Sequence, residues 1–172
     1  VEGRFSQIRF VDDSKEMHQL IACIVEQSRP MGLKVPGQKA FLAAAREARK
    51  LSFFDGFTDP QELARTLRAA YPMVPAALYL LPRLAARMAQ NERTTFSFIN
   101  SVDLGRPVRM LNLFEGFSEA MRSDVGAGGS HRRWLEAQTA LSKTESAEEA
   151  EAIAAAALLG LGRAGHRTRL SK

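Results

Sequence analysis

The chain has 172 residues, of which 45% are hydrophobic and 25% charged, and its formal net charge is +5. This composition is typical of a folded globular protein and excludes a disordered chain. A single cysteine excludes a disulfide framework, and no apolar stretch approaches the roughly 20 residues of a membrane-spanning helix.

The N-terminal residues are compatible with one short strand and predict one helix. The extended segment covers residues 4–11, whose apolar members are Phe5, Ile8 and Phe10. Asp13 and Glu16 have the spacing of a capping box, which indicates the start of a helix. The apolar positions of that helix follow the spacing of one buried face: Met17, Leu20, Ile21, Ile24 and Val25.

Cys23 lies within this first helix, and we expect its thiol to be buried in the core. A lone buried thiol fits a reducing compartment such as the cytoplasm. Pro30 and Gly32 end the helix, because proline cannot continue it and glycine favours turns.

Two further helices are predicted before residue 70. The first covers residues 39–51, and its buried side contains Phe41, Ala45, Ala48 and Leu51. An aromatic turn at residues 52–58 follows. Asp59 and Pro60 then occupy the N-cap and first position of the next helix. Its inward-facing residues are Leu63 and Leu67.

Residues 71–101 form the most distinctive stretch of the chain. Pro75 can open a helix, and residues 76–89 are apolar on nearly all sides, which indicates burial on several sides. Pro82 predicts a kink in this helix. The polar residues 90–93 end its apolar part, and apolar residues resume at Phe96. A further helix is predicted for residues 111–121.

A glycine-rich connector at residues 123–130 divides the chain into two parts, 1–125 and 126–172. Ser130 can cap a helix that contains Trp134, and Ser146 with Glu149 forms a second capping box before an alanine-rich helix that reaches about Leu161. The chain ends in a basic tail. We therefore predict an all-α fold, an irregular array of about six to seven helices with at most one short N-terminal edge strand.

Motifs that would form a complete catalytic site are absent from the sequence. The segment GLKVPGQKA (32–40) resembles a phosphate-binding loop, but Gln38 precedes Lys39, and Ala40 replaces the hydroxyl residue that holds magnesium. The three histidines are far apart, and Cys23 has no partner at metal-ligand spacing. The sequence predicts no catalytic residue and no metal site in this chain.

Four long polar residues, Gln90, Asn91, Glu92 and Arg93, follow the apolar helix. Such groups are costly at a buried helix end unless they form specific hydrogen bonds. One interpretation is a helix terminus with a local Glu92–Arg93 ion pair. The alternative is a functional junction in which Arg93 points toward a phosphate or an acid of a neighbouring domain.

A second cationic cluster is GGSHRRW (128–134). Arg132 and Arg133 would lie in the first turn of a helix, where the helix dipole disfavours positive charge. Cations at this position fit a bound anion or an acidic partner. The alternative is a surface helix whose Trp134 packs inward while the arginines are solvated.

These segments resemble the middle region of large bacterial P-loop ATPases of the AAA+ or STAND-like type. The resemblance covers most of residues 1–142 and is carried by VEGRFSQIRFV, YPMVPAALYLLPRLAARMAQNERTTFSFINS and FSEAMRSDVGAGGSHRRWLE. In that family an apolar helix with Pro-Arg leads into Q-N-E-R followed by Ser or Thr, and a GG-x-x-RRW element comes later. Proteins of this type often accompany DNA restriction or phage-defence genes.

The resemblance implies that residues 1–125 are a helical lid-like domain and residues 126–172 a helical connector with a basic tail. Together they would couple a nucleotide-binding core to downstream domains. ATP and Mg²⁺ would bind in the parent protein, because the chain itself lacks the Walker motifs. The candidate nucleotide-sensing residues are Arg93, then Arg132 and Arg133, with Glu92 and Asn91 in support.

The partner implied is the remainder of the parent ATPase, with no membrane, and an oligomer is compatible with the sequence. The alternative function is a stand-alone helical module that binds nucleic acid or another protein. A location of the basic residues on one face would support nucleic-acid binding. These residues are Arg83, Arg87, Arg132, Arg133, Arg167 and Arg169.

Overall fold

The computed structural model describes residues 15–88 and 91–167, and the side chains of these residues apart from 91–93 and 163–167. They form eight helices: α1 (Lys15–Ser28), α2 (Gln38–Lys50), α3 (Pro60–Ala69), α4 (Pro75–Arg87), α5 (Asn91–Ser101), α6 (Met110–Ser123), α7 (His131–Leu141) and α8 (Ala147–Arg167). The prediction of an all-α fold is confirmed. The additional helix is α5: three of the four polar residues, Asn91, Glu92 and Arg93, begin a new helix that continues to Ser101.

The predicted strand at residues 4–11 and the capping residue Asp13 lie outside the described residues. Within the described ranges, the only strand-like feature is one parallel bridge between Met73 and Val108. In this bridge the Val74 amide donates to the Val108 carbonyl at 3.0 Å. The bridge therefore holds the chain that leads into α4 beside the chain that leads into α6.

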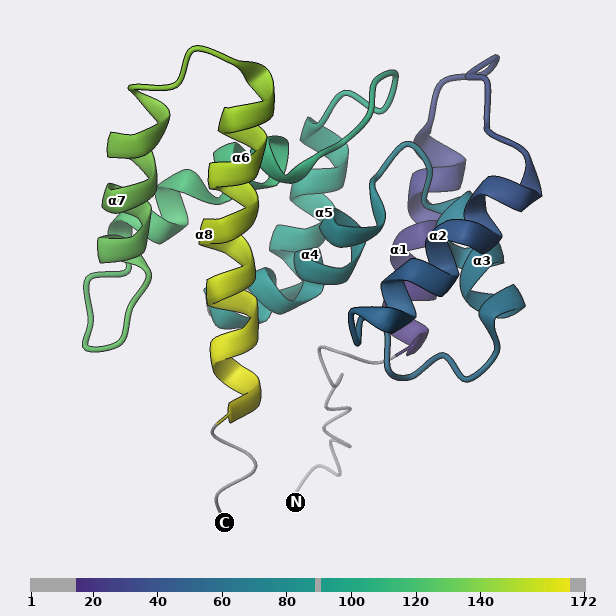
Figure 1. Cartoon of the computed structure of the whole chain (residues 1–172), viewed down its shortest axis with the longest axis horizontal. Helices are drawn as coiled ribbons and strands as arrows, with labels where there is room; N and C mark the ends of the chain where they lie inside the picture. The colour runs from purple at the N-terminus through teal and green to yellow at the C-terminus, as the bar shows by residue number, and fades with distance from the viewer. Residues whose placement is uncertain (1–14, 89–90, 168–172) are drawn as a thin grey trace, which may run out of the picture.

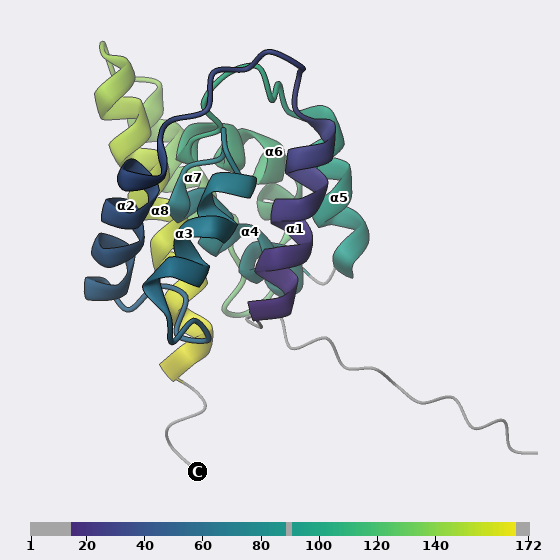
Figure 2. The same cartoon turned by 90° about the vertical axis from the view of Figure 1, so that its right-hand side faces the viewer.

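The helices are arranged around α4. Helices α1–α3 gather at one end of the molecule and α7 and α8 at the other, with α4 and α5 between them (Figure 1). Helix α4 contacts α1, α2, α5, α6 and α8. The view turned by 90° shows α1 running beside α5 (Figure 2).

Helix α4 is buried on several sides, as its apolar sequence predicts, and this burial explains the arrangement. Buried residues cover most of its circumference: Ala77, Leu78, Tyr79, Leu80, Leu81, Pro82, Leu84 and Ala85. A helix that is apolar on all sides must be surrounded by other elements. The core is continuous from α1 to α8, since Leu158 and Leu161 of α8 belong to the same cluster as Ile21 of α1. The predicted division after residue 125 stays a prediction.

The aromatic turn between α2 and α3 folds inward. Phe53, Phe54 and Phe57 are all buried. The ring of Phe53 stacks on that of Tyr79, with 4.3 Å between centroids. His18 of α1 is also buried, and its ring meets the edge of Phe54 at 4.9 Å. The turn therefore joins α1 to the central helix through aromatic contacts.

The burial of His18 overturns one expectation for α1. Cys23 is exposed rather than buried, and Leu20 is 42% exposed. The buried face is formed instead by Met17, His18, Ile21, Ala22 and Val25. Because the aromatic rings draw His18 inward, the buried face is rotated toward Ala22, and Cys23 points away from it. Leu51, expected on the buried side of α2, is likewise exposed.

One predicted helix start forms in full and a second forms in part. The Asp59 carboxylate accepts a hydrogen bond from the Gln61 amide at 2.8 Å, and Pro60 opens α3. The Ser146 hydroxyl accepts from the Glu149 amide at 3.2 Å. The carboxylate of Glu149 reaches the amide of Glu145 instead of that of Ser146, so only half of this capping box is formed.

Candidate functional site

The end of α4 contacts the start of α7, where the second cationic cluster of the sequence lies. The Arg87 guanidinium, at the end of α4, donates to the Gly128 carbonyl at 2.9 Å. The neighbouring Met88 sulfur lies 3.5 Å from the Ser130 hydroxyl. The end of α4, just before residues 90–93, therefore contacts the start of α7. We call the contact between residues 87–88 and 124–131 the α4–α7 junction.

An internal carboxylate occupies the N-terminus of α7. Asp124 accepts hydrogen bonds from the Ser130 amide at 2.7 Å and the Ser130 hydroxyl at 2.8 Å. The backbone hydrogen bond, then the side-chain one, holds the pKa of Asp124 below its usual value, and Arg87 adds a smaller effect in the same direction. Ser130 does not cap α7 with its own side chain, contrary to the prediction. Its hydroxyl instead donates to Asp124.

The loop before α7 depends on its glycines, as the sequence suggests. Gly128 has a φ of +79°, in the left-handed region that favours glycine. A Cβ atom at Gly129 would collide with the Asp124 carbonyl oxygen. These two residues let the chain turn closely enough to bring Asp124 to the helix end.

The candidate arginines of α7 are both exposed. Arg132 is paired with Glu136 at 3.0 Å, and the exposed fractions of the two side chains are 92% and 63%. The Arg133 guanidinium lies against Gly160 of α8, where an added Cβ atom would collide with it. Trp134 is half-buried and donates from its indole nitrogen to the Ser118 hydroxyl at 2.6 Å. Trp134 thus anchors α7 on α6.

The candidate residues Asn91, Glu92 and Arg93 form the first turn of α5. Their side chains lie outside the described residues, so their role stays a prediction. In the sequence they follow α4, whose last residues contact the start of α7.

The six arginines of the alternative function do not form one free basic face. The Arg83 guanidinium lies over the Tyr79 ring, 4.1 Å from its centroid. Arg87 is engaged at the α4–α7 junction. The side chain of Arg167 and the whole of Arg169 lie outside the described residues. Arg83 and Arg87 are therefore engaged in contacts within the chain, which does not favour a nucleic-acid surface built from this set.

Glu151 is a structural residue that the sequence did not single out. Its two carboxylate oxygens accept hydrogen bonds from the Met110 amide at 2.8 Å and the Leu111 amide at 3.0 Å. Asn112 accepts from the Arg109 amide at 2.9 Å. Helix α8 therefore caps the N-terminus of α6, which has no acidic residue in its first turn. Glu151 lies about 40 residues after the start of α6, so no local sequence pattern predicts this contact.

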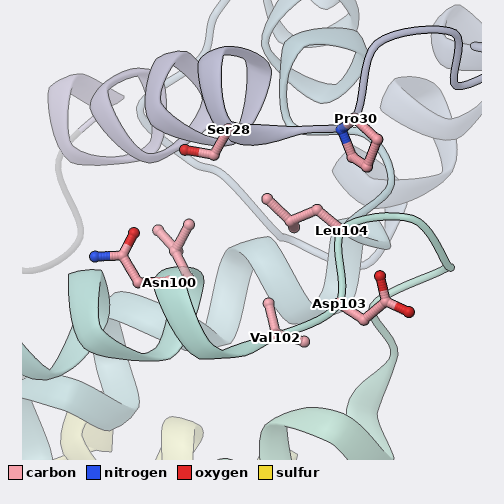
Figure 3. Close-up of a pocket in the computed structure, with 7 residues that line it drawn as sticks. Ser28, Pro30, Asn100, Val102, Asp103 and Leu104 are labelled. Atoms are coloured by element: carbon pink, nitrogen blue, oxygen red, sulfur yellow. The ribbon is translucent and has the colours of Figure 1, made fainter.

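A shallow groove lies between the ends of α1 and α5 (Figure 3). Ser28 of α1 lies across it from Asn100 of α5, and Leu104 lies below Pro30 in this view (Figure 3). Asp103 also lines the groove and pairs with Arg106 at 3.6 Å. The remaining lining residues are Pro30, Ile99 and Val102.

Within the described ranges, no three His, Cys, Asp or Glu side chains are gathered to hold a metal ion. None of the helices found there is long and apolar enough to cross a membrane. Comparisons with known protein families, with curated proteins and with solved structures give no match to this chain.

Proposed function

We propose that this chain is the helical lid and coupling region of a larger P-loop ATPase. The observation that carries the proposal is the position of α4. This helix contacts helices at both ends of the molecule and leads directly into residues 90–93, the segment at the centre of the resemblance. A displacement at its C-terminal end would move both ends of the array together, because closely packed interiors transmit strain.

In this proposal, cationic side chains near the α4–α7 junction respond to nucleotide. Arg93 contacts nucleotide or the core, and Glu92 and Asn91 orient it. Arg132 is the second candidate, since its ion pair with Glu136 is exposed and contributes little energy. Its guanidinium can therefore exchange Glu136 for a phosphate. Arg133 is held closer to the chain, against Gly160.

What supports a phosphate contact is the exposed guanidinium of Arg132, since guanidinium groups bind phosphate oxygens in a bidentate manner. ATP with Mg²⁺ would supply the phosphoryl group that is transferred, and the P-loop, the magnesium ligands and the attacking water would belong to the core. The part played by this chain is to sense the phosphate and to move as a lid.

The experiment is an ATPase assay on the full-length protein encoded by the open reading frame. Arg93→Ala should lower turnover by about 100-fold, the typical effect of losing one charge-stabilising donor, and Arg93→Lys should recover part of it. Arg106→Ala is the matched control, because Arg106 is exposed and pairs locally with Asp103. Unchanged turnover in a folded Arg93→Ala protein would rule out the sensor role. A reading frame without a Walker A motif would overturn the whole proposal.

A further inference from the structure

Helix α2 has the largest excess of positive charge among the described helices. It contains Lys39, Arg46, Arg49 and Lys50, against the single acid Glu47. The other cation-rich helix is α4, whose two arginines are held by Tyr79 and Gly128. The cations of α2, in contrast, are all exposed.

Three of these cations form one stripe. With about 100° between successive residues of an α-helix, Lys39, Arg46 and Lys50 fall within an arc of about 40°. The stripe lies opposite the buried residues Phe41 and Ala45. With a rise of about 1.5 Å per residue, it is about 17 Å long. We call these three residues the α2 stripe.

The α2 stripe is largely available for binding. Among the described residues, neither Lys39 nor Arg46 forms an ion pair. Lys50 is paired with Glu47 at 2.7 Å, but the two side chains are 70% and 67% exposed. Such a pair contributes little and can be exchanged for another anion. Arg49 lies beside the stripe, and the small residue Ala43 lies within it.

The chemistry of the α2 stripe favours a linear polyanion. Protein interfaces depend on buried aromatic or arginine anchors, and lysine is depleted in them. A helix that lies on a membrane needs large apolar residues beside its cations. The α2 stripe has only Ala43 between its cations, and the exposed Leu51 follows the helix. Evenly exposed cations without an apolar anchor match the repeated phosphates of a nucleic acid.

We propose that the α2 stripe binds the phosphate backbone of a nucleic acid without sequence specificity. This goes beyond the coupling function, since the stripe lies on α2 and uses none of the candidate nucleotide-sensing residues. Arg65 and Arg68 of α3 are also exposed and lie on the helix that packs against α2.

The test measures binding of the whole chain to a fluorescently labelled 20-base-pair DNA duplex by anisotropy, at salt concentrations from 50 to 200 mM. The triple variant Lys39→Gln, Arg46→Gln, Lys50→Gln removes the α2 stripe. The matched control removes three exposed cations elsewhere: Arg106→Gln, Arg122→Gln and Lys143→Gln. Both variants have the same net charge. Far-UV circular dichroism checks that each is folded.

If the α2 stripe binds phosphate, the plot of log K against log salt should become shallower in the stripe variant. The magnitude of its slope should decrease by about 2.7, which is about 0.9 for each lost phosphate contact. The control should keep the wild-type slope. The single change Arg46→Gln should lower it by about 0.9, which tests the proposal even if the triple variant does not fold. Equal losses in both triple variants, or no binding by the wild type, would overturn the proposal. So would stripe-dependent binding of polyglutamate alone, which would indicate an acidic protein partner.

Discussion

Replacing Glu151 by alanine tests whether α8 holds α6 in place. The substitution removes a half-buried carboxylate that accepts hydrogen bonds from the first two amides of α6, at 2.8 and 3.0 Å. Hydrogen bonds to charged groups contribute about 1.5–3 kcal/mol each when buried, and helix caps about 0.5–2 kcal/mol. Because Glu151 is only half-buried, we expect a loss of about 2–3 kcal/mol in the free energy of unfolding. Glu151→Gln keeps one acceptor oxygen and should cost about 1 kcal/mol.

The measurement is urea unfolding of the whole chain, followed by circular dichroism and by the fluorescence of Trp134, the only tryptophan. Trp134 lies on α7, which packs against both α6 and α8. It therefore reports loosening of this end of the molecule. The control is Glu148→Ala, an exposed residue in the first turn of α8, which should cost no more than about 0.5 kcal/mol. Equal losses for the two alanine variants would refute the capping role of Glu151.

Three further predictions concern packing and charge. Gly116→Ala should destabilise the chain by about 1–3 kcal/mol in the same urea assay, because the added Cβ atom would lie 2.6 Å from the buried Phe98 ring. Leu81→Ala should cost about 2–5 kcal/mol, since Leu81 is fully buried in α4. The pKa of Asp124 is lowered in the folded state, so its contribution to stability is present above the ordinary carboxyl pKa near 3.8 and is lost as the pH falls below it. Asp124→Asn should accordingly flatten the acid limb of a plot of stability against pH; an unchanged limb would contradict this.

The sequence predicted the fold class well because periodicity and caps are local signals. The start of α3 at Asp59–Pro60 and the buried character of residues 76–87 required no knowledge of tertiary contacts. The face of α1 could not be predicted in the same way. A histidine counts as polar in any pattern, yet His18 is buried among aromatic rings from the turn after α2. The exposure of Cys23 follows from that distant contact.

The start of α7 shows why the candidate site was harder to predict. Cations in a first helical turn predict a nearby anion, and a carboxylate does lie at the start of α7, although it binds Ser130 while Arg132 pairs with Glu136. This carboxylate is Asp124, six residues before Ser130, which reaches the helix end because Gly128 and Gly129 turn the loop back on itself. A phosphate at this position would compete with Asp124 for the Ser130 amide. Any contact of Arg132 with nucleotide must therefore be made by its exposed guanidinium, beside the helix end and not at its amides.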